Sequence, residues 1–269
     1  MHIDSEVHFW KYDRSNSNLL VRNNKLLAQH YLPEQLSQSL HRNGIQGCVA
    51  VVAENLEVET RFLSELAYTH PEILGVVGWT DLHDPHAEEK IKELQEYTPI
   101  KGFQYSPVAD QEPSVAVMEL LRAHQYRLDL SLNVQTSLTA LIQWIKSFPD
   151  QTFILRNCGN PDASKTPSTE WKKLIRELAR NTNLYCKVSG FLSSAKGKSW
   201  KPADFYLFLD IVFDAFGLER LLYASDWPFL LLSGIYVQWK SLLEKYMEKF
   251  SEEERNLFFG ENAASVYQL

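Results

Sequence analysis

Short apolar, β-branched runs alternate with longer amphipathic segments from one end of the chain to the other. Runs of this kind, bounded by polar and turn-forming residues, are typical of buried strands. The expected strands are Met1–Val7, Cys48–Ala53, Ile73–Leu82, Ile100–Tyr105, Arg127–Val134, Thr152–Gly159, Leu184–Gly190 and Arg220–Ser225. Strands that alternate regularly with helices indicate βαβ units, and therefore parallel pairing within one sheet.

The amphipathic segments between and after these strands predict helices. They are Pro33–Asn43, Val58–His70, Pro85–Tyr97, Pro113–His124, Leu138–Phe148, Glu170–Asn181, Ala203–Phe216, Tyr236–Lys249 and Glu252–Tyr267. Eight strands is the number that closes a (β/α)8 barrel, which typically needs about 250 residues. We therefore expect residues 1–269 to form a single α/β domain, a TIM barrel. An open, doubly wound sheet is the alternative, but the glycine-rich first turn that would favour it is missing.

Composition narrows the kinds of partner and location. Hydrophobic residues make up 45% of the chain, and its net charge is -7 without a long basic run. Nucleic acid and anionic membranes are therefore unexpected partners, and a small-molecule substrate is favoured. The three cysteines lie far apart, and acidic residues near the N-terminus replace the positive charge of a signal peptide, so we expect reduced thiols in the cytoplasm. The apolar C-terminal helices could support a homodimer, although nothing in the sequence requires one.

The strongest group of chemistry-bearing residues comes from the two ends of the chain. Glu6 and His8 lie two residues apart on the first strand, so they point to the same side. Asp226 follows the last strand, which is the neighbour of the first in a closed barrel. Two carboxylates and an imidazole could hold zinc or manganese, or could act as general acid and base without a metal. The alternative is that they only hydrogen-bond to one another in a polar barrel mouth.

Several segments match a known family in order along nearly the whole chain. They are Ile3-Asp4-Ser5-Glu6-Val7-His8-Phe9-Trp10, Gly75-Val76-Val77-Gly78-Trp79-Thr80-Asp81-Leu82, Lys101-Gly102-Phe103, Cys186-Lys187-Val188-Ser189-Gly190, Ser225-Asp226-Trp227-Pro228 and Glu261-Asn262-Ala263-Ala264. The chain thereby resembles the amidohydrolase-related (amidohydrolase 2) family, in its sugar-lactonase and 2-pyrone-4,6-dicarboxylate lactonase branch. The resemblance implies a TIM barrel that hydrolyses a carbonyl ester, often a lactone. It also implies that Asp226 manages the proton of the attacking water, with a divalent metal in some branches only.

Three histidines of the family pattern are replaced. Glu6 stands at the first position of the usual His-x-His, and Gln104-Tyr105 replaces Arg-His after the fourth strand. Arg156-Asn157-Cys158-Gly159 replaces Asp-His-x-Gly at the sixth strand. These changes remove nitrogen ligands that hold zinc, so any metal would be bound by Glu6, His8 and Asp226.

Other polar and aromatic residues near the strand ends are candidates for binding the substrate. Gln104, Tyr105 and Asn157 can donate hydrogen bonds to a carbonyl or its oxyanion. Lys187 could pair with a substrate carboxylate or with Asp226, or could form a structural ion pair inside the barrel. Trp10 and Trp227 could line an aromatic pocket, or could simply pack in the core and rim.

The leading hypothesis is therefore a hydrolase of a small cyclic ester or a related carbonyl compound. Asp226 would activate water, while His8 and Glu6 hold a metal or polarise the carbonyl. The alternative is a diverged member of the family without lactonase activity, either a ligand-binding barrel or a metal-independent lyase or isomerase.

Overall fold

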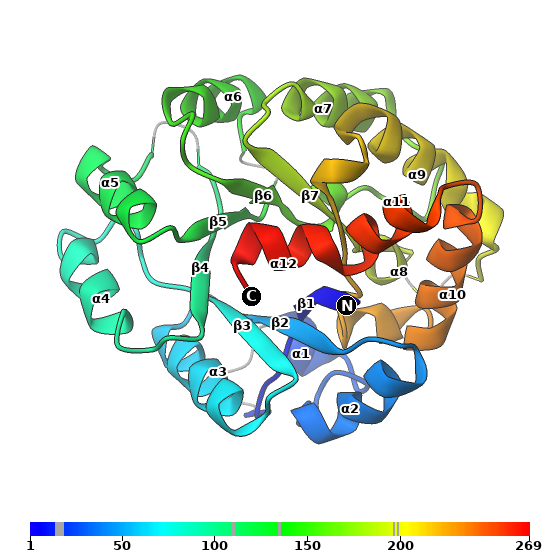
Figure 1. Cartoon of the computed structure of the whole chain (residues 1–269), viewed down its shortest axis with the longest axis horizontal. Coiled ribbons are helices and arrows are strands. Elements are labelled where there is room, and N and C mark those ends of the chain that lie inside the picture. Colours follow the sequence, from blue (N-terminus) through cyan, green and yellow to red (C-terminus); the bar gives the residue numbers. More distant parts are fainter. Residues whose placement is uncertain (14–18, 109–110, 134–135, 196, 198) are drawn as a thin grey trace.

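Eight parallel strands form one sheet that curls into a nearly closed barrel (Figure 1). The computed structural model describes residues 1–13, 19–108, 111–133, 136–195, 197 and 199–269. The strands follow one another around the sheet in chain order, and Val7 bridges Trp227 where the last strand meets the first. Their bounds are β1 Ile3–Val7, β2 Gly47–Val51, β3 Ile73–Gly78, β4 Ile100–Tyr105, β5 Arg127–Leu130, β6 Phe153–Leu155, β7 Leu184–Val188 and β8 Leu221–Tyr223. The prediction of a (β/α)8 barrel is confirmed.

Most of the helices form an outer ring around the strands, and the last helix crosses the middle of that ring (Figure 1). They are α1 Leu19–Asn23, α2 Pro33–Arg42, α3 Glu57–Thr69, α4 Ala87–Leu94, α5 Val115–Ala123, α6 Leu138–Ser147, α7 Thr169–Ala179, α8 Phe191–Ser194, α9 Pro202–Phe216, α10 Tyr236–Met247, α11 Glu252–Asn256 and α12 Asn262–Tyr267. The sequence pattern did not predict the short helices α1 and α8. In the part of the chain that the structure describes, no helix is both long and apolar enough to cross a bilayer.

The helix expected over Glu252–Tyr267 is divided in two. A π-helical turn at Leu257–Glu261 separates α11 from α12. A side chain on Gly260 would place its Cβ only 1.9 Å from the carbonyl oxygen of Met1, so this turn brings bare backbone against the N-terminal segment. The wider turn therefore lets α12 leave the outer ring.

Helix α12 covers the amino-terminal end of the barrel and crosses the middle of the ring in Figure 1. Ala263, Val266 and Tyr267 of this helix share a buried cluster with inward-facing residues of the strands. The strand residues of the cluster are Ile3, Val49, Val51, Val77, Ile154 and Leu222. Because α12 closes this end, the polar residues at the carboxyl ends of the strands face the opposite end.

Several strands end earlier than their apolar runs suggest. The strand expected over Thr152–Gly159 stops at Leu155, because Asn157 and Cys158 adopt positive φ angles of 49° and 47°, which no strand can contain. Strand β5 ends at Leu130 rather than at Val134, which lies outside the described residues. These early ends leave room for turns that carry polar side chains at the barrel mouth.

Strand β1 contains an irregularity that decides which side chains enter the barrel. Its pairing with β2 shifts register between Asp4 and Val7. Such a bulge interrupts the simple alternation of faces along a strand. As a result Ile3 packs in the interior cluster, and Glu6, three residues later, also faces inward.

Candidate active site

Glu6, His8 and Asp226 come together at the carboxyl end of the barrel. One ligand atom from each lies within 4.8 Å of the others. His8 Nε2 is 3.6 Å from Glu6 Oε1 and 3.5 Å from Asp226 Oδ1. All three side chains are buried, with exposed fractions of 0%, 1% and 3%. Charges in such a setting interact strongly because little water screens them.

The imidazole of His8 is fixed by a backbone carbonyl on the next strand. His8 Nδ1 lies 2.8 Å from Val51 O, and a carbonyl oxygen only accepts, so Nδ1 carries the proton and Nε2 faces the two carboxylates. Burial by itself lowers the pKa of His8, but hydrogen bonds with Asp226 and Glu6 outweigh it and raise the pKa above its usual range. His8 thus presents Nε2 either as a ligand or as a protonated donor.

Asp226 sits on a strained turn three residues after the end of β8. Its φ of 61° lies in the left-handed region, which Asp and Asn tolerate better than other residues with a side chain. The backbone N–H of Asp226 donates to Glu6 O at 3.0 Å, which ties the turn to β1. Ser193 Oγ donates to Asp226 Oδ2 at 2.8 Å. One carboxylate oxygen is therefore held from α8, and the other, Oδ1, faces His8.

Arg156 is the main component of this site that sequence reasoning missed. It follows β6 and is buried, with an exposed fraction of 7%. Its Nε and Nη2 donate to the same oxygen, Glu6 Oε1, at 2.8 and 2.5 Å, and Nη2 lies 3.5 Å from His8 Nε2. Burial alone would raise the pKa of Glu6, but the charges of Arg156 and Lys187 overcome it and hold that pKa well below its usual range.

A second buried ion pair lies on the other side of Glu6. Lys187 Nζ donates to Asp129 Oδ2 at 2.6 Å and lies 3.6 Å from Glu6 Oε2. Tyr267 of α12 donates to the same Asp129 carboxylate, whose pKa is raised by burial. Of the partners expected for Lys187, the structure has the ion pair inside the barrel. It does not pair Lys187 with Asp226.

Gln104 and Tyr105 point to opposite sides of β4. Gln104 accepts a hydrogen bond from Arg156 Nη1 and donates to Asn55 Oδ1 at 2.9 Å, so it holds Arg156 in place. Tyr105 donates to Gln111 O at 2.9 Å, and its ring packs against Trp144 of α6. Adjacent strand residues face opposite sides of a sheet, so Tyr105 points away from the cluster around Glu6, and its contact with the substrate stays a prediction.

The remaining expected residues surround the cluster without touching Glu6. Asn157 is half-buried, and its Oδ1 accepts a hydrogen bond from Ser189 at 2.7 Å. Trp10 packs its ring 5.5 Å from Phe229, which in turn lies edge-on to His8 at 5.2 Å. Trp227 packs between the rings of Phe9 and Tyr31, so its side chain is part of an aromatic cluster at the rim of the barrel.

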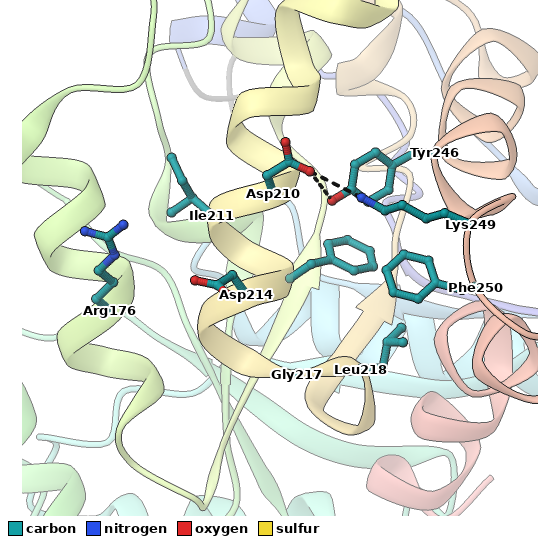
Figure 2. Close-up of a pocket in the computed structure, with 10 residues that line it drawn as sticks. Arg176, Asp210, Ile211, Asp214, Gly217, Leu218, Tyr246, Lys249 and Phe250 are labelled. Atoms are coloured by element: carbon teal, nitrogen blue, oxygen red, sulfur yellow. Dashed lines mark hydrogen bonds and ion pairs between the residues drawn. The ribbon is translucent and has the colours of Figure 1, made fainter.

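One cavity lies at the carboxyl end of the barrel, and another lies on its outside. A pocket of about 270 Å³ adjoins the ends of β1 and β2, and is lined by Trp10, Lys11, Asp13, Val21, Ala53, Glu54, Leu56, Val58, Glu59 and Phe62. Figure 2 shows a larger groove of about 600 Å³ on the outside of the barrel, where Asp210 accepts hydrogen bonds from Tyr246 and Lys249. Because the groove lies among α7, α9 and α10, it is remote from Glu6, His8 and Asp226.

The donor set at the strand ends fits a divalent cation in its chemistry. Glu6, His8 and Asp226 supply two carboxylates and one imidazole, ligands that zinc accepts. Glu6 Oε2 is buried and, among the described residues, receives no hydrogen bond. His8 Nδ1 is bound by a carbonyl, which is the usual outer contact of a metal-binding histidine. The chain therefore offers a group able to hold a divalent metal.

Comparison with known proteins agrees with this architecture. An L-fucono-1,5-lactonase of Burkholderia multivorans is 30% identical over 287 residues, covering 100% of this chain and 96% of the relative. An L-fucono-1,5-lactonase of Burkholderia ambifaria is 27% identical, covering 99% and 95%. The crystal structure of an amidohydrolase from Burkholderia multivorans with bound zinc superposes with a TM-score of 0.90 at 30% identity, covering 100% and 99%. The family model described as Amidohydrolase matches residues 3–269, and this chain belongs to the amidohydrolase family.

Proposed function

We propose that this protein hydrolyses the ester bond of a small sugar lactone, with L-fucono-1,5-lactone as the first substrate to test. The observation that carries the proposal is the position of Asp226, whose oxygen Oδ1 faces His8 Nε2 at 3.5 Å on a turn with a left-handed backbone at the barrel mouth. Two relatives that match almost the whole chain are named as lactonases, which supports this substrate class. The pocket beside Trp10 has a volume of about 270 Å³, just below the usual range of about 300–1,000 Å³ for ligand pockets, so it suits a small ligand.

The reaction needs a base for water and a group that stabilises the carbonyl oxygen. Water attacks the carbonyl carbon, and Asp226 Oδ1 accepts its proton. The bond between the carbonyl carbon and the ring oxygen then breaks, and Asp226 returns the proton to that oxygen, which yields an open-chain hydroxy acid. Ser193 holds the second oxygen of Asp226, so the accepting oxygen keeps its direction during the reaction.

His8 and Asn157 complete the arrangement in this proposal. His8 Nε2 faces the reacting region and can donate to the developing oxyanion when it is protonated, as its raised pKa favours. The amide of Asn157 lies at the mouth and can orient the substrate. When a divalent metal, zinc or manganese, is bound by Glu6, His8 and Asp226, it supplies Lewis-acid polarisation of the carbonyl.

The experiment is a lactonase assay of the wild type and two matched variants. Hydrolysis of L-fucono-1,5-lactone and related sugar lactones is followed by NMR and corrected for spontaneous opening. Asp226→Asn keeps the shape and the tolerated backbone angle but removes the base, so kcat should fall by about 10²–10⁴-fold. Asp210→Asn, in the outer groove of Figure 2, should leave kcat unchanged.

Two outcomes would count against the proposal. If Asp226→Asn had the same kcat as the wild type, Asp226 would be excluded as the base. No turnover of any sugar lactone by the wild type would favour the alternative of a ligand-binding barrel or a metal-independent lyase or isomerase.

A further inference from the structure

The guanidinium of Arg156 occupies the side of the cluster that a metal would need. Its Nε and Nη2 both donate to Glu6 Oε1, at 2.8 and 2.5 Å, and Nη2 is 3.5 Å from His8 Nε2. Glu6 Oε1 and His8 Nε2 belong to two of the three residues in the Glu6, His8 and Asp226 group, and they are the atoms through which these two residues face each other, at 3.6 Å. A cation of this protein is therefore already seated on the atoms that would bind a metal cation.

Arg156 and a divalent ion cannot share these atoms without strong repulsion. Zinc binds a carboxylate oxygen at about 2 Å, so an ion on Glu6 Oε1 would lie within about 5 Å of Nη2. The guanidinium is buried, which weakens the screening of like charges. Arginine also keeps its proton under all ordinary conditions, so it cannot yield by becoming neutral.

Arg156 is also held firmly where it is. Its Nη1 donates to Gln104, and Gln104 is anchored in turn by Asn55 at 2.9 Å. On the other side of Glu6, Lys187 Nζ lies 3.6 Å from Oε2, so each carboxylate oxygen faces a buried cation. Glu6 is thus neutralised by residues of the chain itself.

We infer that Arg156 and a divalent metal are alternative partners of Glu6, so that Arg156 sets the metal affinity of the site. A metal binds only when the guanidinium leaves Glu6 Oε1. The free energy needed to break the ion pair between Arg156 and Glu6 therefore makes metal binding less favourable by the same amount. The inference concerns cation binding without substrate, and it holds whichever substrate the enzyme uses.

The test measures zinc binding to metal-free protein by competition with a chromophoric chelator. Arg156→Met removes the charge and keeps much of the bulk, so zinc should bind at least about tenfold more tightly than to the wild type. Arg156→Lys keeps the charge, and its affinity should lie below that of Arg156→Met. Asp226→Asn replaces one carboxylate ligand by a neutral amide and should bind zinc more weakly than the wild type, whereas binding by surface groups such as His86 and Glu89 would be the same in both.

An affinity of Arg156→Met within twofold of the wild type, or weaker, would overturn the inference. So would equal affinities of Arg156→Met and Arg156→Lys. If Arg156→Met does not fold, the inference is tested instead with crystals of the wild-type protein soaked in zinc, in which the position of the Arg156 guanidinium is compared with and without the metal. Displacement of the guanidinium from Glu6 supports the inference. Zinc bound by Glu6, His8 and Asp226 with Arg156 still hydrogen-bonded to Glu6 refutes it.

Discussion

Tyr267 donates its hydroxyl to the carboxylate of Asp129, with its oxygen 2.9 Å from Oδ1 and 2.8 Å from Oδ2. Tyr267 belongs to α12, which closes the amino-terminal end, whereas Asp129 belongs to β5 inside the barrel. Lys187 joins Asp129 to Glu6, so a chain of polar contacts runs from the closing helix to the candidate active site. The helix that covers one end of the barrel therefore also contacts the buried charged residues in the barrel interior.

Tyr267→Phe should destabilise the fold. The change removes a buried hydrogen bond to a charged group, worth about 1.5–3 kcal/mol in the free energy of unfolding. Urea unfolding measures the loss. The matched control is Tyr246→Phe, whose hydroxyl donates at 2.8 Å to the half-exposed Asp210 and should cost less. Equal losses of unfolding free energy in the two variants would contradict the prediction that the buried hydrogen bond contributes more than the partly exposed one.

Glu6→Gln should destabilise the protein more than any surface change of the same kind. Arg156 and Lys187 would keep their charges in the interior and lose their shared carboxylate. Breaking a buried ion pair from one side costs about 3–5 kcal/mol. The control is Glu177→Gln, which removes a partly exposed surface pair with Arg180 and should cost less than about 1 kcal/mol. If Glu6→Gln were as stable as the wild type, the buried charges of Arg156 and Lys187 would not need the carboxylate of Glu6.

Asp4 should make stability fall as the pH rises from about 4 to 6. Burial raises the pKa of its carboxyl from 3.8 to about 6, so the folded state binds the proton more tightly than the unfolded state. The stabilisation is complete below the unfolded pKa and is lost as the pH passes through the folded one, by about 3 kcal/mol in total. Asp4→Asn cannot titrate. The difference in unfolding free energy between wild type and Asp4→Asn should change across this range, and a constant difference would refute the prediction.

Substitutions of the neighbouring residues Gln104 and Tyr105 on β4 should differ in their effect on activity, because one side chain faces the barrel interior and the other faces away from it. Gln104→Leu removes the acceptor that holds Arg156 and should lower kcat/KM for a confirmed lactone substrate by about tenfold or more. Tyr105→Phe changes a hydroxyl that binds Gln111 O outside the cluster, so kcat/KM should stay within about twofold. Steady-state kinetics of both variants provide the measurement. A larger loss in Tyr105→Phe would mean that its hydroxyl reaches the substrate.

Much of the barrel could be predicted because buried parallel strands are short apolar runs between helices. Strand β4 has the expected bounds, Ile100–Tyr105. The register shift between Asp4 and Val7 could not be predicted, since a bulge leaves no sign in the apolar pattern. The early end of β6 depends on the left-handed backbone of Asn157 and Cys158, which tertiary contacts impose.

Asp129 and Arg156, the partners of Lys187 and Glu6, were the main omissions, and the sequence carried a signal for them. Asp129 stands between Leu128 and Leu130, and Lys187 lies between Cys186 and Val188, each a lone charge in an apolar strand. A buried charge needs a partner, so two opposite charges in such strands predict each other. Arg156 could have been recognised in the same way, because it places a positive charge where the family pattern has an acidic residue.

The left-handed backbone at Asp226 restricts which residues evolution can place there. Asp, Asn and glycine tolerate this conformation most readily, and of these only Asp carries a negative charge. A lineage that lost hydrolysis but kept the barrel would most readily arrive at Asn or glycine. In a survey of relatives, either residue after an otherwise intact eighth strand would mark proteins that have become binders rather than hydrolases.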